Sequence, residues 1–349
     1  MKRMSPWASP AGLVRAFRVV GGPPIFLALT IVLLVLIPLL AKGIRIGEFD
    51  VFNGLKTFAS LGLVALALSL TMVLGEFDLS VLGSYAFGGL VGVQVGQDHP
   101  FLGLAAAIGV GAVTGVIQSE IMTRLRLSSV PVTLGGLLIL LGLTYRLSDG
   151  KDVPFKDIDF GLSIDTAVFN VISVRALVSL AVCAVVALVL TMTAAGRLVR
   201  AVGGDRRGSE TNGLPVRKVV VVVFAMSGAC SALAGAMAAY ALASAQASIG
   251  FQPLTFAVTA ALIGGVTLAG GRGGVVGITC AAVALSLVQG IFQVIALQVY
   301  YSDVIMGALL AVVAAVQAPG LRDKLRARQA RRAGPGESVD QPAMEPALR

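Results

Sequence analysis

The sequence predicts an all-α polytopic membrane protein with about ten transmembrane helices. Hydrophobic residues make up 56% of its 349 residues and charged residues only 13%, whereas charged residues account for about 25% of an ordinary soluble domain. The mean hydropathy is +0.90. The charges are concentrated between apolar segments of roughly the 20 residues that a helix needs to cross a bilayer. The three cysteines lie inside apolar segments without CxxC spacing, so we expect them to pack rather than bind metal or form disulfides.

Ten apolar segments follow one another along the chain, separated by polar turns. The first begins near Pro23; it is too long for a signal peptide and lacks a small-residue cleavage site, so we expect it to be retained. The predicted spans cover residues 23–41, 57–74, 82–97, 101–119, 131–145, 176–195, 219–243, 254–269, 275–298 and 304–317. They divide the chain into a basic N-terminus (1–22), a transmembrane domain (23–318) and a basic tail (319–349) that we expect to be partly disordered.

The distribution of positive charge predicts the orientation. Segments assigned to the inside contain 20 of the 27 Lys and Arg residues, and the outer segments contain seven. Because Lys and Arg favour the cytoplasmic side, both termini are predicted to be cytoplasmic, as in a multi-pass protein of the inner membrane. The same bias explains the net charge of +9 without a nucleic acid partner. In the outer loop 146–175, we expect the acidic residues to form a solvated surface.

Small residues recur at four-residue spacing in several spans. Such ridges allow helices to approach closely in lipid, where no hydrophobic force drives them together. We therefore assign these residues a packing role: Gly88, Gly92 and Gly96; Gly111 and Gly115; Ser227, Ser231 and Gly235.

A basic segment interrupts the apolar pattern between residues 195 and 219. Six Lys or Arg residues stand there against Asp205 and Glu210. Residues 206–211 are long enough for a short helix, and Asn212-Gly213 followed by Pro215 is a helix stop. We expect this helix to lie across the cytoplasmic mouth of the bundle, where a soluble partner could push on it. Its basic side chains are expected to face acids of that partner.

A polar turn, residues 75–80, follows the second span. Ionisable groups within a span are costly, which makes Glu76 and Asp78, with the neighbouring Ser80, candidate membrane-embedded functional residues. The alternative is that both acids lie at the interface and that Asp78 caps the following helix, the favoured interpretation for Asp78. Segment 74–80 has an echo in residues 263–269, which suggests an internal repeat of the kind found in transporters.

Enzymatic motifs are missing from the sequence. It has a single histidine, His99, and neither a GxSxG motif nor a GxxxxGK[ST] phosphate loop, so we expect no enzyme and no nucleotide hydrolysis by this chain. The glycine-rich stretch 270–274 follows no predicted strand and is interpreted as a tight turn between helices. Glutamines within or near the spans have two interpretations, as solute ligands or as bonds between helices: Gln94, Gln118, Gln246, Gln289 and Gln293.

Three blocks of sequence resemble the permease subunits of ribose/xylose-type sugar ABC importers, a group that also includes branched-chain amino acid permeases. They are LGEFDLSVLGSYAFGGLVG (74–92), AVGGDRRGSETNGLPVRKV (201–219) and LIGGVTLAGGRGGVVG (262–277). The resemblance covers roughly residues 55–318. It implies a permease dimer, a separate pair of ATPase subunits that dock on the cytoplasmic loops, and an extracytoplasmic solute-binding protein that delivers sugar. It implies no cofactor in this chain, because the partner subunit uses ATP.

The resemblance also implies that residues 201–216, within the loop 196–218, couple the permease to the ATPase. This chain departs from the family pattern: Asp205 stands where Asn is usual, Gly208-Ser209 where Ala-Ala is usual, and Glu76 where Gly is frequent. The residues expected to carry the coupling are Gly204, Asp205, Arg206, Arg207, Gly208, Ser209 and Gly213.

The expected function is therefore translocation of a monosaccharide or similar small polar solute by alternating access. Three alternatives remain open at this point. The first is a permease for branched-chain amino acids or nucleosides, and the second is a secondary transporter that works alone. The second would need intramembrane acids, for which only Glu76 and Asp78 qualify. The third, a polytopic membrane enzyme, is disfavoured because the catalytic motifs are missing.

Overall fold

The computed structural model describes residues 30–32, 47–168, 171–267, 269–295 and 298–317, and it confirms the all-α class. The first predicted span lies outside the described residues except for 30–32, as do the predicted N-terminus and tail. Six helices of the described part are long and apolar enough to cross a membrane. They are α3 (Glu48–Val73), α5 (Pro100–Leu125), α6 (Ser129–Leu147), α8 (Val174–Met192), α11 (Val216–Ala241) and α13 (Val275–Val294).

Shorter elements complete the bundle. Three further apolar helices are α4 (Val81–Gly96), α12 (Gln252–Ile263) and α14 (Val299–Gln317). The predicted spans from 57–74 onwards each overlap one of these nine helices, although α12 ends six residues earlier than its predicted span. The remaining helices are α7 (Ile158–Ile164), α9 (Ala194–Gly204) and α10 (Arg206–Thr211). Two antiparallel pairs of short strands join β1 (Val153–Pro154) to β4 (Ser244–Ala245), and β2 (Ala167–Val168) to β3 (Ile172–Ser173).

Local sequence explains several helix starts. Pro100 and Pro253 stand in the first turns of α5 and α12, where the missing amide hydrogen costs nothing. The side chains of Asp157 and Ser173 accept hydrogen bonds from the first turns of α7 and α8, from the amides of Phe160 and Ala176. Each of these residues satisfies or removes a donor that the helix itself cannot pair.

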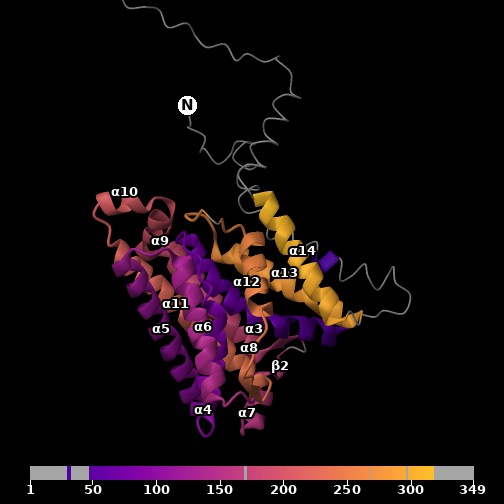
Figure 1. Cartoon of the computed structure of the whole chain (residues 1–349). Helices are drawn as coiled ribbons and strands as arrows, with labels where there is room; N and C mark the ends of the chain where they lie inside the picture. The colour runs from indigo at the N-terminus through magenta and orange to yellow at the C-terminus, as the bar shows by residue number, and fades with distance from the viewer. Residues whose placement is uncertain (1–29, 33–46, 169–170, 268, 296–297, 318–349) are drawn as a thin grey trace, which may run out of the picture.

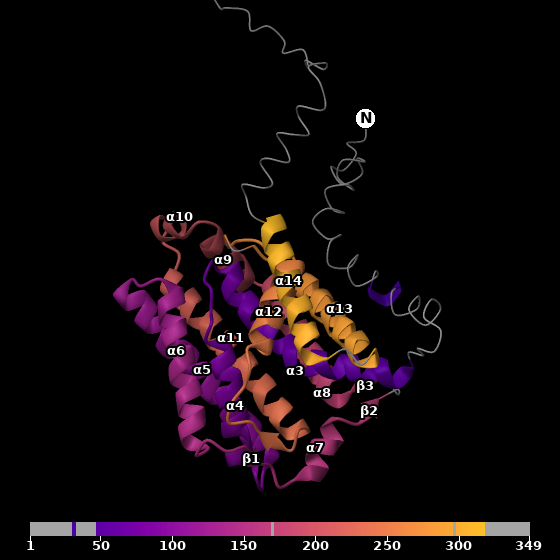
Figure 2. The same ribbon diagram turned by 45° about the vertical axis from the view of Figure 1, so that its right-hand side comes forward.

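The core of the bundle lies around α3 and α11. Both helices are mostly buried within the chain, whereas α5, α6 and α8 expose most of their apolar side chains. Figures 1 and 2 show α3 and α11 inside the bundle, with α6 at its outer surface. The exposed faces of α5, α6 and α8 are therefore available to lipid or to another chain.

The small-residue ridges pack as the sequence predicts, because α4 and α5 both lie against α11. A Cβ atom on Gly88 would lie 2.5 Å from Cα of Ala232, and one on Gly111 would lie 2.2 Å from the carbonyl oxygen of Gly228. Neither position can therefore hold a larger residue while the helices keep this spacing. In the same interface the hydroxyl of Tyr240 donates to the carbonyl of Gly92 at 2.8 Å.

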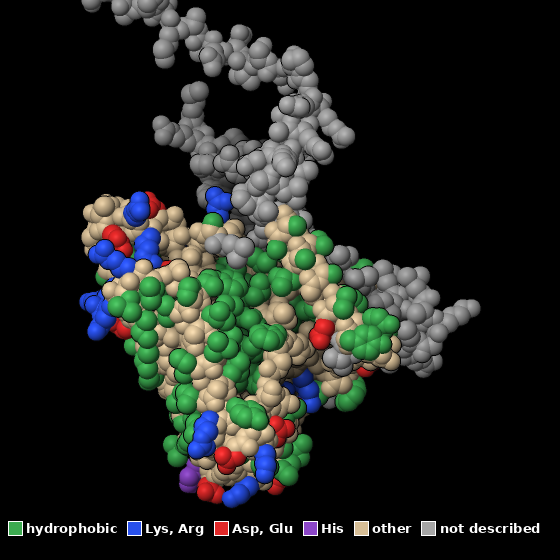
Figure 3. Space-filling model, in the orientation of Figure 1, with side chains coloured by type: hydrophobic (Ala, Val, Ile, Leu, Met, Phe, Trp, Pro, Cys, Tyr) green, Lys and Arg blue, Asp and Glu red, His purple; other side chains and the backbone are tan. Residues whose placement is uncertain are grey.

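The predicted inner loops gather at one end of the molecule, and the predicted outer loop 146–175 lies toward the other, whereas the starts of α3 and α14 lie at an intermediate height (Figure 1). At the first end, shown at the top of Figure 1, lie α9, α10 and the turns after α3 and α12. At the opposite end, α7 and the β1–β4 pair cover the ends of α4 and α11. On the face drawn in Figure 3, charged side chains gather mainly at these two ends, with hydrophobic side chains between them.

Candidate functional site: the coupling end

The predicted short helix in the basic segment is confirmed: α10 covers Arg206–Thr211. Asp205 is its N-cap and accepts a hydrogen bond from the amide of Gly208 at 2.9 Å. At its other end, Gly213 has φ +75°. The amides of Gly213 and Leu214 donate back to the carbonyls of Glu210 and Ser209, both at 3.0 Å. This paired geometry is a Schellman motif, which a left-handed glycine stabilises.

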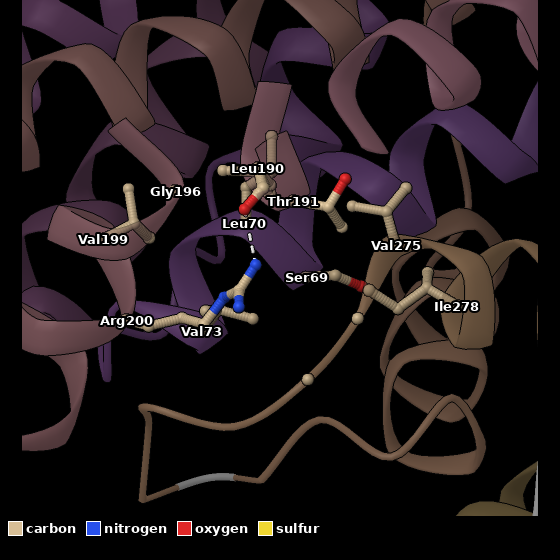
Figure 4. A pocket seen from close by; sticks show the side chains of 12 residues that line it. Ser69, Leu70, Val73, Leu190, Thr191, Gly196, Val199, Arg200, Val275 and Ile278 are labelled. Atoms are coloured by element: carbon tan, nitrogen blue, oxygen red, sulfur yellow. Dashed lines mark hydrogen bonds between the residues drawn. The ribbon is translucent and has the colours of Figure 1, made fainter. Parts of the chain in front are cut away.

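Helix α9 precedes α10 and is fixed to the end of α8. The guanidinium of Arg200 donates to the carbonyl oxygen of Leu190, as Figure 4 shows. A Cβ atom on Gly196 would lie 1.9 Å from that same oxygen, so α9 can approach α8 this closely only with glycine at 196. The small pocket between them, which also touches Ser69 of α3, has a volume of about 20 Å³ and is large enough only for water. We therefore interpret it as part of the joint between α8 and α9.

Glu76 connects the 74–80 segment to α10. A carboxylate oxygen of Glu76 lies 2.5 Å from Nη1 of Arg206. The Glu76 side chain is 14% exposed and that of Arg206 is 42% exposed, so the ion pair is partly shielded from water. The sequence suggested an external partner for Arg206, but the structure gives it a partner within the chain, 130 residues away. Arg207, by contrast, is exposed and pairs with no acid in the described part of the chain.

Asp78 is buried, and the favoured interpretation from the sequence holds only in part: Ser80 occupies the N-cap position of α4, but the Asp78 carboxylate accepts a hydrogen bond from the amide of that residue. Asp78 is only 2% exposed. Oδ1 accepts hydrogen bonds from the amide and the hydroxyl of Ser80, and Oδ2 accepts one from Ser227 on α11. Ser80 itself occupies the N-cap position of α4. Burial raises the pKa of the Asp78 carboxyl above its ordinary value, while the hydrogen bonds from Ser80 and Ser227 oppose the shift.

Phe77 joins the same segment to α6. Its amide donates to the hydroxyl of Ser129 at 3.1 Å, and its carbonyl accepts from Thr133 at 3.2 Å. Three consecutive residues of the 74–80 segment thus contact three different helices: Glu76 contacts α10, Phe77 contacts α6 and Asp78 contacts α11. A displacement of α10 would therefore reach the two long helices through a short piece of backbone.

Glycines at the ends of α3 and α9 and in the 270–274 turn form a close backbone junction. The amide of Gly271 donates to the carbonyl of Val73 at 2.8 Å. A Cβ atom on Gly203 would lie 2.1 Å from that carbonyl oxygen, and one on Gly270 would lie 2.6 Å from Cα of Gly75. The sequence interpreted 270–274 only as a turn between helices. In the structure this turn also holds the end of α9 against the end of α3.

The two similar segments of the sequence, 74–80 and 263–269, contain helix ends of the same geometry. Gly75 and Gly265 have φ of +84° and +86°, and each follows its helix by the same Schellman pattern of backbone hydrogen bonds. In the structure Gly75 therefore corresponds to Gly265, whereas the sequence alignment of 74–80 with 263–269 pairs Gly75 with Gly264. The shared feature is thus a helix end.

Two further ion-pair groups escaped the sequence analysis. Glu120, at the coupling end of α5, pairs with Arg124 at 2.7 Å and with Arg217 at the start of α11. At the opposite end, Asp165 pairs with Lys56 at 2.7 Å and with the buried Arg175 at 2.9 Å. Asp165 is therefore a structural residue, and the expectation of a solvated acidic surface is wrong for it. The pair Glu120–Arg217 joins residues 97 positions apart, and Lys56–Asp165 also joins distant residues, whereas Glu120–Arg124 is an i,i+4 pair within α5 and Asp165–Arg175 spans 10 residues.

The described residues contain no group of three His, Cys, Asp or Glu side chains that could hold a metal ion. Cys183 and Cys230 are buried and free, and Cys280 is half-buried and free. The arrangement at the coupling end can transmit displacement between helices.

Comparison with known proteins gives a family match and several relatives among sugar permeases. Residues 51–314 match the family model described as the permease component of branched-chain amino acid transport systems. The D-allose transport system permease protein of Escherichia coli is 31% identical over 253 residues, which cover 70% of this chain and 75% of the relative. The ribose import permease protein of Haemophilus influenzae is 29% identical over 270 residues, or 76% of this chain and 83% of the relative.

A third relative, the L-arabinose transport system permease protein of Escherichia coli, is 27% identical over 279 residues, which cover 78% of this chain and 84% of the relative. No solved structure matches the chain. The resemblance that the sequence indicated is confirmed by the family match and by these sugar permeases. The chain therefore belongs to the family of permease components that its residues 51–314 match.

Proposed function

We propose that this protein is the membrane-spanning permease subunit of an ATP-binding-cassette importer for a monosaccharide. The observation that carries the proposal is the joint between α10 and the 74–80 segment, made by Glu76 and Arg206. A permease driven by a separate motor needs a contact surface for the motor and a path from that surface into its bundle. Helix α10 supplies the surface, and residues 76–78 supply the path to α6 and α11.

The proposed cycle starts outside the membrane domain. ATPase subunits dock against the exposed side of α10, where Arg207 and Glu210 are accessible. ATP binding and release displace α10 and, through Arg206 and Glu76, the end of α3. The bundle then opens alternately to either side. A second copy of the permease completes the path, and this chain carries no cofactor of its own.

The opposite end of the molecule is proposed to receive the solute-binding protein. There, Asp152 accepts a hydrogen bond from the amide of Ala247, and the side chain of Gln97 bonds to Pro154 and Lys156. These contacts, together with the β1–β4 pair, stiffen the loop 148–157 across the ends of three helices. A stiff, charged surface suits the docking of a soluble protein that must release its cargo at a fixed place.

Uptake into proteoliposomes tests the function. The permease would be reconstituted with the ATPase and the binding protein encoded alongside it, and labelled ribose, arabinose, allose and leucine would be offered in turn. We expect uptake of a sugar that requires ATP and both partners. Uptake by the permease alone would instead identify a facilitator or a secondary transporter. Preference for leucine would assign the chain to amino acid transport, in line with the description of its family as permease components of branched-chain amino acid transport systems.

The proposed topology has ten spans with both termini in the cytoplasm, in the inner membrane. Ser338→Cys and Asp157→Cys would each be introduced after Cys183, Cys230 and Cys280 have been replaced. A membrane-impermeant thiol reagent added to intact cells should label the Asp157 variant and leave the Ser338 variant unlabelled, because positively charged segments stay inside. Labelling of the Ser338 variant from outside would contradict the topology.

A further inference from the structure

A cavity of about 470 Å³ lies between α5 and α6. This volume falls within the range of about 300–1,000 Å³ that is usual for small-molecule sites. Its wall is almost entirely apolar, with Ile117, Ile121, Ile139 and Leu140 among the lining residues. The cavity is partly open on the exposed side of the two helices. Its lining includes the polar side chain of Gln118.

Gln118 has a buried amide oxygen without a hydrogen-bond partner. The residue is 6% exposed, and its Oε1 is the buried side-chain atom that lacks a partner among the described residues. Other glutamines of the bundle are used differently: the amide of Gln94 donates to the carbonyl of Leu147 at 3.1 Å. Gln94 therefore bonds a neighbouring helix, whereas the Gln118 oxygen has no partner among the described residues.

We propose that Gln118 is a solute-contact residue whose Oε1 accepts a hydrogen bond from a hydroxyl of the transported solute in the α5–α6 cavity. The inference rests on the proposed function and adds a binding position to it. Oε1 is buried in the structure, so the proposal requires rotation of the terminal amide, a torsion with a broad energy profile, to bring Oε1 to the cavity. A wall with few polar groups would hold a sugar weakly, which suits a path that must also release it.

A lipid chain is the other occupant that an apolar cavity in a membrane protein could take. Hydrocarbon has no donor, so it would leave the Gln118 oxygen unsatisfied in a medium where such groups are costly. A hydroxylated solute supplies that donor. The exposed rim of isoleucines then requires cover from the second permease copy, so the site in one chain is complete only in the dimer.

The cavity is also connected to the coupling end. Its α6 wall includes Gly136, one helical turn after Thr133, and Thr133 donates to the carbonyl of Phe77. Gly136 lies directly against the Gln118 amide: a Cβ atom there would be 2.7 Å from its Cδ. Movement of the 74–80 segment would therefore shift the wall that faces Gln118. This contact would connect movement driven by the ATPase subunits to the proposed solute position at Gln118.

Transport kinetics of Gln118→Leu test the proposal, with Gln94→Leu as the matched control. In the complete reconstituted importer we expect Gln118→Leu to raise the KM for the sugar about two- to tenfold, the effect of one lost hydrogen bond. ATPase stimulation by the loaded binding protein should persist. Gln118→Asn should recover part of the effect, because it keeps the acceptor on a shorter side chain. An unchanged KM in Gln118→Leu would overturn the inference, whereas absence of sugar uptake by the wild type would overturn the proposed function.

A thiol at the cavity distinguishes solute from lipid. Gly135 lines the cavity and has open space where its side chain would be, so Gly135→Cys should fit without strain. In a background without the native cysteines, we expect a water-soluble thiol reagent to label it in membranes and transported sugar to slow the labelling. Failure to label in membranes, with labelling after detergent extraction, would indicate a lipid-filled cavity and overturn the inference. Labelling that sugar does not affect would overturn it as well.

Discussion

Glu76→Arg should abolish most of the coupling between sugar binding and ATP hydrolysis. The substitution places two arginines against each other where the carboxylate of Glu76 now lies 2.5 Å from the Arg206 guanidinium. Neutral Glu76→Gln should be milder, at most about fivefold, because a partly exposed ion pair contributes only about 0–1 kcal/mol. The measurement is ATPase stimulation by loaded binding protein, together with sugar uptake, in the reconstituted complex.

The matched control is the reversed pair, Glu76→Arg with Arg206→Glu. If the two residues act through each other, the double variant should recover coupling that each single reversal loses, and a double-mutant cycle isolates the shared part. Equal loss in the single and double variants would mean that either residue acts through another partner. Glu210, whose carboxylate lies 3.8 Å from Nε of Arg206, provides the comparison, and Glu210→Gln should have little effect.

Local patterns predicted the elements of the coupling end but not their contacts. The helix over 206–211 could be predicted because its stop, Asn212-Gly213-Leu214-Pro215, is written in consecutive residues. The ion pair between Glu76 and Arg206 could not, since 130 residues separate the partners. Proximity of that kind depends on how long helices pack, which a single sequence does not reveal.

The same limit applies to Asp78. A bond from its carboxylate to an amide at the start of the next helix could be expected from the sequence, but the bond from Ser227, 149 residues away, could not. Gln118 illustrates the reverse case. Its type and its place in a span suggested a ligand or a helix–helix bond with equal force. The described structure shows no partner for Oε1, and on that observation we propose the ligand role.

Gly213→Val should uncouple the permease from its ATPase while leaving the membrane bundle folded. Gly213 has φ +75°, a conformation that costs a β-branched residue about 1–3 kcal/mol. The surrounding space is empty, so the penalty comes from the backbone and not from a clash. Helix α10 makes few contacts with the rest of the chain apart from α9 and the Glu76 pair, so the strain should be relieved by loss of the Schellman motif and displacement of α10.

Two controls separate backbone strain from loss of a small side chain. Gly213→Asn should keep most of the coupling, because asparagine tolerates the left-handed conformation better than other residues. Gly204→Val adds the same side chain at another expected coupling residue, which has open space and no positive φ, so a larger loss of coupling in Gly213→Val than in Gly204→Val would measure the backbone strain at 213. The readouts are stimulated ATPase activity and uptake, with thermal unfolding of the purified permease to establish that the bundle is intact. Normal coupling in Gly213→Val would show that α10 is only a linker between α9 and α11, and that the ATPase acts on another part of the coupling end.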